Sequence, residues 1–179
     1  MLENVMKENH ILEQIQIDLS SERYDCSLVM ASEEIPFDQL LVFLGNDAKE
    51  REKILQITTF KQTMAQESKK KEESYHLVKF VVNLPFSVEP SAASQTASTL
   101  LFINRFLELP GFELGELEDQ VFYRYVLFTK GNKVDPLLLF SLIGNVMMII
   151  DLFNGVIESV ASGEKTFNDL LEEMLSLTK

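Results

Sequence analysis

The chain is poor in the residues that build disulfides, metal sites and catalytic centres. It has one cysteine, Cys26, two histidines, His10 and His76, and no tryptophan. A single cysteine cannot form an internal disulfide, and these three side chains stand at no recognised ligand spacing. Two histidines also leave few ways to build a nucleophile and its base. We therefore expect no metal, no cofactor and no enzyme activity, and we interpret Cys26 as a small buried residue and His76 as an ordinary strand residue.

Clustered glycines and excess positive charge are also missing. The seven glycines are scattered singly, so neither the dinucleotide-binding nor the Walker pattern occurs. Acidic residues number 28 against 16 basic ones, which gives a net charge of −12 and a pI of about 4.6. Such a charge repels a phosphate backbone and an anionic lipid surface. We expect neither nucleic acid nor a membrane as a partner.

Targeting and membrane-spanning signals are weak as well. The opening residues, MLENVMKENHILEQ, lack the basic and apolar regions of a secretory signal. The longest uncharged stretch near the C-terminus, Pro136 to Ile150, is shorter than the roughly 20 residues needed to cross a bilayer and contains Ser141 and Asn145. These observations predict a cytoplasmic protein.

What is present is the composition of a globular domain. Hydrophobic residues make up 46% of the chain and charged residues 25%, which indicates neither disorder nor a fibrous class. A chain of 179 residues can bury most of its apolar surface without disulfides. We expect residues 1–179 to form a single domain.

Apolar periodicity predicts an α+β fold, an antiparallel sheet packed with helices. Strand-like alternation and helix-like spacing follow each other along the chain, with Pro85 ending one strand and Pro110-Gly111 ending one helix. The polar segment 61–74, KQTMAQESKKKEES, is predicted to be a mobile loop. The predicted helices are 2–19, 90–109, 136–163 and 167–177, and the predicted strands are 24–31, 40–44, 53–60, 75–82, 112–114 and 120–129.

The helix that begins at Pro136, with Asp135 as its N-cap, is apolar on nearly every face as far as Ile150. A helix of this kind is either wholly internal or shared between two subunits. The second reading predicts a homodimer. The residues we expect at a subunit contact are Leu138, Leu142, Met147, Met148 and Ile149.

The last predicted helix has two readings. Residues 167–177 place their apolar side chains on one side, and such a helix either completes a core or docks on a partner. Paired carboxylates such as Glu118-Asp119 are read as solvated surface charge. A rival hypothesis uses Glu116 or Glu118 with Arg124 in a pocket between the sheet and the helices, which would make the chain an enzyme or a small-ligand protein.

Two segments of the second half resemble a known bacterial family. LLFINRFLELPGFEL, Leu100 to Leu114, is followed by VFYRYVLF, Val121 to Phe128. This succession of a helix ending in an Asn-bearing segment, a Phe-x-Leu strand and a longer strand resembles the YbjN-like proteins, and residues 75–163 follow their pattern. The order of elements resembles the fold that this family shares with type III secretion chaperones.

The resemblance implies a fold and a type of function. The chaperones are small, acidic, cytoplasmic homodimers that hold other proteins along their surface, and neither family supplies catalytic residues. We therefore expect a non-enzymatic protein-binding protein, chaperone-like or a regulatory partner of another bacterial protein, for example one of a secretion system.

Overall fold

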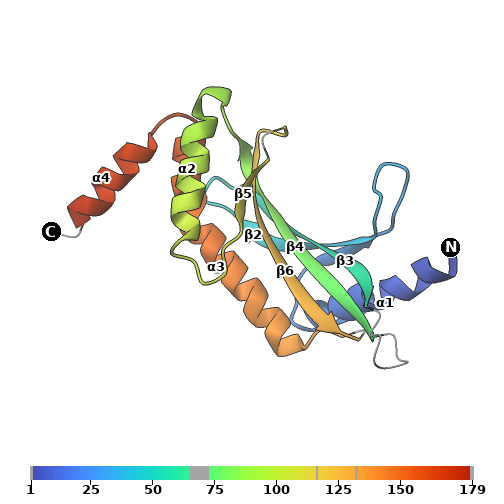
Figure 1. The fold of residues 1–179 in the computed structure, drawn as a ribbon. Coiled ribbons are helices and arrows are strands. Elements are labelled where there is room, and N and C mark those ends of the chain that lie inside the picture. The colour runs from blue at the N-terminus through green and yellow to red at the C-terminus, as the bar shows by residue number, and fades with distance from the viewer. Residues whose placement is uncertain (1, 65–72, 116, 132, 178–179) are drawn as a thin grey trace. The chain divides into compact units, whose positions relative to one another are not determined.

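The computed structural model describes residues 2–64, 73–115, 117–131 and 133–177 (Figure 1). Six strands form one antiparallel sheet in the order β1-β2-β3-β4-β6-β5, and with the helices they make the predicted α+β fold. The helices are α1 (Leu2–Ser21), α2 (Ala93–Asn104), α3 (Pro136–Ala161) and α4 (Phe167–Leu177), with a 3-10 turn at Pro90–Ala92. The strands are β1 (Cys26–Val29), β2 (Gln39–Asn46), β3 (Glu52–Met64), β4 (Glu73–Ser87), β5 (Phe112–Gly115) and β6 (Gln120–Lys130).

The chain divides into two compact units. Unit 1 comprises Met1–Val81 and Val126–Asn145, and unit 2 comprises Val82–Tyr125 and Val146–Lys179. Strands β4 and β6 and helix α3 each contribute residues to both units. That residues 1–179 form a single domain stays a prediction.

Unit 1 is built on helix α1 and the first three strands. β1 pairs with β2, and β2 with β3, in antiparallel register. Helix α1 contacts all three strands. Its buried side chains repeat at helical spacing, while alternate residues of β2 and β3 face it, which is the pattern expected of a helix lying on a sheet. The fully buried apolar residues here include Ile11, Leu12, Ile15, Leu19, Leu40, Val42, Leu55 and Ile57.

Strands β3 and β4 are longer than the sequence predicted. β3 continues to Met64 and β4 begins at Glu73, so the loop predicted at 61–74 is wrong at both ends, and its remainder lies outside the described residues. β4 also runs through Pro85 to Ser87. The side-chain amide of Gln120 donates to the carbonyl oxygens of Leu84 and Phe86, so these carbonyls point toward β6. Because successive strand residues direct their backbone groups to opposite edges, the nitrogen of Pro85 points away from β6 and its missing N–H does not interrupt that edge.

Unit 2 contains α2, β5 and α4. Helix α2 ends at Asn104, before the predicted stop at Pro110-Gly111. The Asn104 side chain explains the early end, since its Nδ2 donates to the Phe112 carbonyl (2.9 Å) and its Oδ1 accepts from the Phe112 N–H (3.1 Å). Asparagine bonded in this way to nearby backbone favours a turn over a continued helix. Gly111 lies so close to β6 that a Cβ there would be 2.1 Å from the Arg124 carbonyl oxygen.

Helix α3 begins and ends as predicted. The Asp135 carboxylate accepts from the Leu138 N–H (3.0 Å), which is N-capping, and Gly163 follows the helix with a φ of +75°. The uncharged stretch Pro136–Ile150 is only the first part of a helix that continues to Ala161, and by length and composition the whole helix could cross a membrane. Leu139, Ile143 and Ile157 are fully buried, and one third of the most apolar 18-residue window of the helix is buried. The cytoplasmic location stays a prediction.

Candidate binding groove

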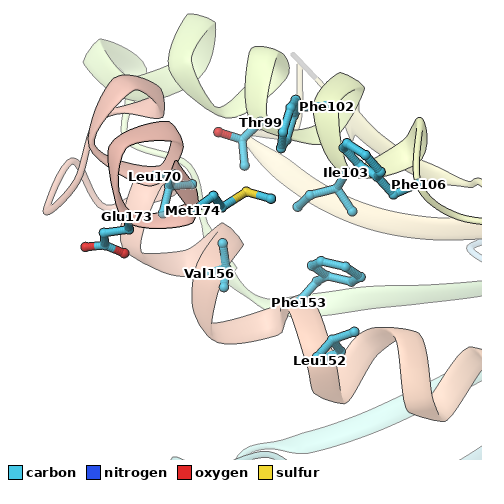
Figure 2. Close-up of a pocket in the computed structure, with 10 residues that line it drawn as sticks. All are labelled: Thr99, Phe102, Ile103, Phe106, Leu152, Phe153, Val156, Leu170, Glu173 and Met174. Carbon is cyan, nitrogen blue, oxygen red and sulfur yellow. The ribbon is translucent and has the colours of Figure 1, made fainter. Parts of the chain in front are cut away.

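An apolar groove of about 370 Å³ lies in unit 2. Figure 2 shows side chains from α2, the second half of α3 and α4 directed toward one space. Glu173 is its one charged member and lies at the margin. The lining residues are Thr99, Phe102, Ile103, Phe106, Leu152, Phe153, Val156, Leu170, Glu173 and Met174.

Helix α2 supplies the aromatic wall of the groove. Its residues Thr99 and Ile103 are buried, and Phe102 lies one turn before Phe106. The two phenylalanine rings meet edge to face with 5.0 Å between their centroids. Phe102 on α2 and Phe106 just after its end thus form an aromatic wall of the groove.

Helix α4 is attached to α2 mainly through its first residue. The Phe167 N–H donates to Gln95 Oε1 on α2 (3.0 Å), and the Phe167 ring packs edge to face on Phe102. Thr166 and Asp169 cap the start of α4, and the hydrogen bonds from the Thr166 backbone and hydroxyl hold the pKa of the Asp169 carboxyl below its usual value. The helix is thus held at its N-terminal end.

The remainder of α4 is stabilised by an ion pair and little burial. Lys165 Nζ lies 2.6 Å from Glu173 Oε1, and this hydrogen bond raises the pKa of Lys165. None of the side chains described in α4 is fully buried. The apolar side of α4 is therefore only partly covered by the chain, and docking of this helix on a partner stays a prediction.

Several large apolar side chains around the groove face solvent. Leu152 is 66% exposed and Phe106 65% exposed. Val156 and Met174, which also line the groove, are 38% and 47% exposed. Other exposed apolar residues of unit 2 are Leu101, Leu117, Met148 and Leu175.

The segments that form the groove carry more acidic than basic residues. The acidic ones are Glu108, Asp151, Glu158, Glu164, Asp169, Glu172 and Glu173, and the basic ones are Arg105 and Lys165. Of these, Glu173 lines the groove, and it is paired with Lys165.

The residues predicted for subunit contact fall into two groups. Leu142 and Ile149 are only 4% and 6% exposed, so the chain itself already covers them. Met148 is 61% exposed and Leu138 about half exposed. The exposure of Met147 is intermediate. Helix α3 is thus not wholly internal, and a contact between two copies along its exposed side stays a prediction.

His76 and Cys26, two of the rare residues considered for catalysis or metal binding, each lie close to a polar group of the chain. His76 is buried, and its Nδ1 lies 2.9 Å from the Gly131 carbonyl oxygen. Cys26 is partly buried in β1, with its Sγ 3.3 Å from the Ser20 hydroxyl. Within the described part of the chain, no three His, Cys, Asp or Glu side chains come together as metal ligands.

Arg124, the arginine of the rival hypothesis, is bonded to a third carboxylate, Glu113. Arg124 Nε donates to Glu113 Oε1 (2.8 Å) across the β5–β6 pair, and both side chains are exposed. The arginine is therefore engaged by Glu113 rather than by Glu118, and Glu116 lies outside the described residues.

No protein-family model matches the chain, and a search of curated proteins finds no significant match. The groove residues were not singled out from the sequence. The spacing of Phe102 and Phe106 was a usable signal, but their apposition with α3 and α4 depends on contacts between segments far apart in the chain.

Proposed function

We propose that this chain is a non-enzymatic protein-binding protein, and that its groove between α2, α3 and α4 receives an amphipathic segment of another protein. The observation that carries this proposal is the groove itself, with apolar side chains from three helices around one hollow and α4 held mainly at its start. An unfilled surface of this kind gains stability when a partner covers it, by about 25 cal/mol for each Å² of apolar area buried.

The charge of the chain narrows the partner. The net charge of −12 on the chain repels an acidic segment, so the segment that fits carries apolar side chains flanked by lysine or arginine. Amphipathic helices bind apolar grooves with side chains spaced three and four residues apart. We therefore assign the groove to a basic amphipathic helix of the partner.

A chaperone-like or regulatory role in a bacterial cytoplasm is the setting we propose for this binding, in line with the resemblance to YbjN-like proteins and secretion chaperones. We also propose that the chain is a homodimer, because Leu138 and Met148 leave apolar surface on the solvent side of α3. Replacing Met148 with Glu should then turn a dimer into a monomer in light scattering after size exclusion. A dimer that persists in Met148→Glu would exclude this side of α3 as the interface.

The groove is tested with two model peptides of equal hydrophobicity, one basic and one acidic, each amphipathic as a helix and labelled for fluorescence anisotropy. The basic peptide should bind, and its affinity should fall as salt rises because the charge of the chain is screened. Leu152→Glu should weaken this binding at least about tenfold, since a buried unpaired carboxylate is costly.

A matched control is Leu117→Glu. Leu117 is 95% exposed and does not line the groove, so the same change of side chain there should leave binding unaltered. Equal binding of the basic and acidic peptides would contradict the charge argument. Equal loss of binding in both variants would contradict the assignment of the groove.

A further inference from the structure

A second hollow, of about 220 Å³, lies in unit 1 on the side of the sheet opposite helix α1. Its base is formed by neighbouring strands, where Gln39 of β2 pairs directly with Thr58 of β3, and β4 follows next in the sheet with Lys79. Gln56 and Val81 extend this base. The hollow is far smaller than the groove in unit 2 and differs from it in being lined by polar groups.

The connection between β1 and β2 provides one wall through Ile35, Pro36 and Phe37. The Phe37 ring meets Phe60 of β3 edge to face, with 5.2 Å between the centroids. At the ends of the connection, the Ala31 N–H donates to the Asp38 carboxylate (2.6 Å). The wall is thus a structured turn that is attached to the sheet.

The polar groups around this hollow have almost no partners of their own. The Thr58 hydroxyl oxygen is buried and has no hydrogen-bond partner among the described residues. Lys79 Nζ lies 5.5 Å from the centre of the Phe60 ring and, within the same part of the chain, forms no ion pair. Nearly all buried polar groups in proteins are hydrogen-bonded, so the unpaired hydroxyl of Thr58 needs an explanation.

The explanation that fits these groups is a bound anion. Lys79 supplies one positive charge, the Thr58 hydroxyl and the amides of Gln39 and Gln56 supply neutral donors, and no lining residue is acidic. A single cation without an arginine fork suits a monoanion better than a phosphate dianion. Val81 and Phe37 offer apolar surface beside it. We propose that this hollow binds a carboxylate group carried on a short apolar stem.

Two sources share that chemistry, a small aliphatic acid and the C-terminal carboxylate of a peptide. Backbone amide signals of the full chain are followed by NMR during titration with butyrate and, separately, with acetyl-glycyl-valine. The signals of residues 35, 37–39, 56–58 and 79–81 should shift with both acids. If the peptide binds at least about tenfold more tightly than butyrate, the ligand is a chain terminus. Equal affinity indicates a small acid.

Two controls test whether the ligand carboxylate and the Lys79 ammonium are required for binding. Acetyl-glycyl-valine amide lacks the carboxylate and should not bind. Lys79→Met should weaken carboxylate binding at least about tenfold, because a charge-assisted hydrogen bond is removed. Lys61→Met makes the same change on β3 outside the hollow and should have no effect. Binding of the amide, or unchanged binding in Lys79→Met, would overturn the proposal.

A second variant keeps the test informative if Lys79→Met folds poorly. Thr58→Val removes the unpaired hydroxyl and keeps the shape of the side chain. The melting temperature of the free protein should rise, because a buried polar group without a partner is destabilising, while the affinity for butyrate should fall. A lower melting temperature with unchanged affinity would mean that Thr58 has no part in binding.

Discussion

The ring of Phe167 meets the ring of Phe102 edge to face, with 5.7 Å between their centroids. This contact attaches α4 to α2 and sets one wall of the groove, because the C-terminal part of α4 has little burial of its own. The groove therefore depends on a small attachment, and a partner that fills it would stabilise α4 as well.

Phe167→Ala should release α4 without unfolding the rest of unit 2. An aromatic pair contributes about 0.5–1.5 kcal/mol beyond its buried area, and α4 has few other contacts. Amide hydrogen exchange should speed up across 168–176 and stay unchanged in α2. Leu175→Ala is the matched control, since Leu175 is exposed. Slow exchange in α4 of the Phe167→Ala variant would show that other contacts hold this helix.

Asn104→Ala should destabilise unit 2. Asn104 links the end of α2 to β5 through hydrogen bonds with Phe112 and Gly111. Removing it leaves partly buried backbone groups unpaired, at a cost of about 1–3 kcal/mol in the free energy of unfolding. Urea unfolding measures this loss. Asn145→Ala removes one exposed bond to the Ser141 carbonyl and should cost less, and an equal cost at both positions would contradict the linking role.

The turn between β2 and β3 should be sensitive to acid. Burial tends to raise the pKa of Asp47, but hydrogen bonds from the Arg51 side chain and from the backbone of Arg51 and Lys49 lower it to about 2. A carboxyl with a depressed pKa in the folded state adds stability above its usual pKa of 3.8, and this is lost as the pH falls toward 2.

Asp47→Asn should therefore cost about 1 kcal/mol of unfolding free energy near pH 7, a figure that allows for solvent screening of a turn at the surface. The difference in unfolding free energy between variant and wild type should disappear when urea unfolding is repeated at lower pH, between about 4 and 2. Glu50→Gln removes a charge from the same turn and is the control. A gap that is constant with pH would mean that the Asp47 charge is not what stabilises the turn.

Tyr123 should resist ionisation at high pH. Burial, with a smaller contribution from Tyr125, raises the pKa of Tyr123 to about 12, and its hydroxyl donates to the Leu109 carbonyl. Because the unfolded chain releases this proton near pH 10, the stability from neutral Tyr123 is present below pH 10 and is lost above it. Ultraviolet titration should show one late tyrosine, absent from Tyr123→Phe. If the ionisation at high pH persists in Tyr123→Phe, it belongs to another tyrosine.

The sequence predicted the elements whose signals are local. Pro136 and Asp135 mark the start of α3, Gly163 follows its end, and the bounds of α4 are the predicted ones. Strand alternation also located β5 and β6. The sequence wrongly predicted that β4 ends before Pro85. Whether a proline interrupts a strand depends on which edge its nitrogen faces, and this is set by the pairing with β6.

The two hollows depend on contacts that a single sequence does not contain. Phe102 and Leu152 line one groove although 50 positions separate them, and Gln39 and Thr58 meet only through the register of β2 and β3. The apolar excess of α3 left open whether this helix is wholly internal or shared between two subunits. It did not indicate that Leu142 and Ile149 are buried within the chain while Leu152 faces solvent.

The central claim, that the groove of unit 2 binds a partner helix, is tested most directly through the methionine methyl groups. Met174 lines the groove, whereas Met30 is exposed in unit 1 and lies outside it. With methionines labelled by carbon-13 at the methyl group, the basic amphipathic peptide is titrated into the full chain. The account predicts that the Met174 signal shifts in proportion to binding while the Met30 signal stays in place. Binding that shifts Met30 and leaves Met174 unmoved would contradict it.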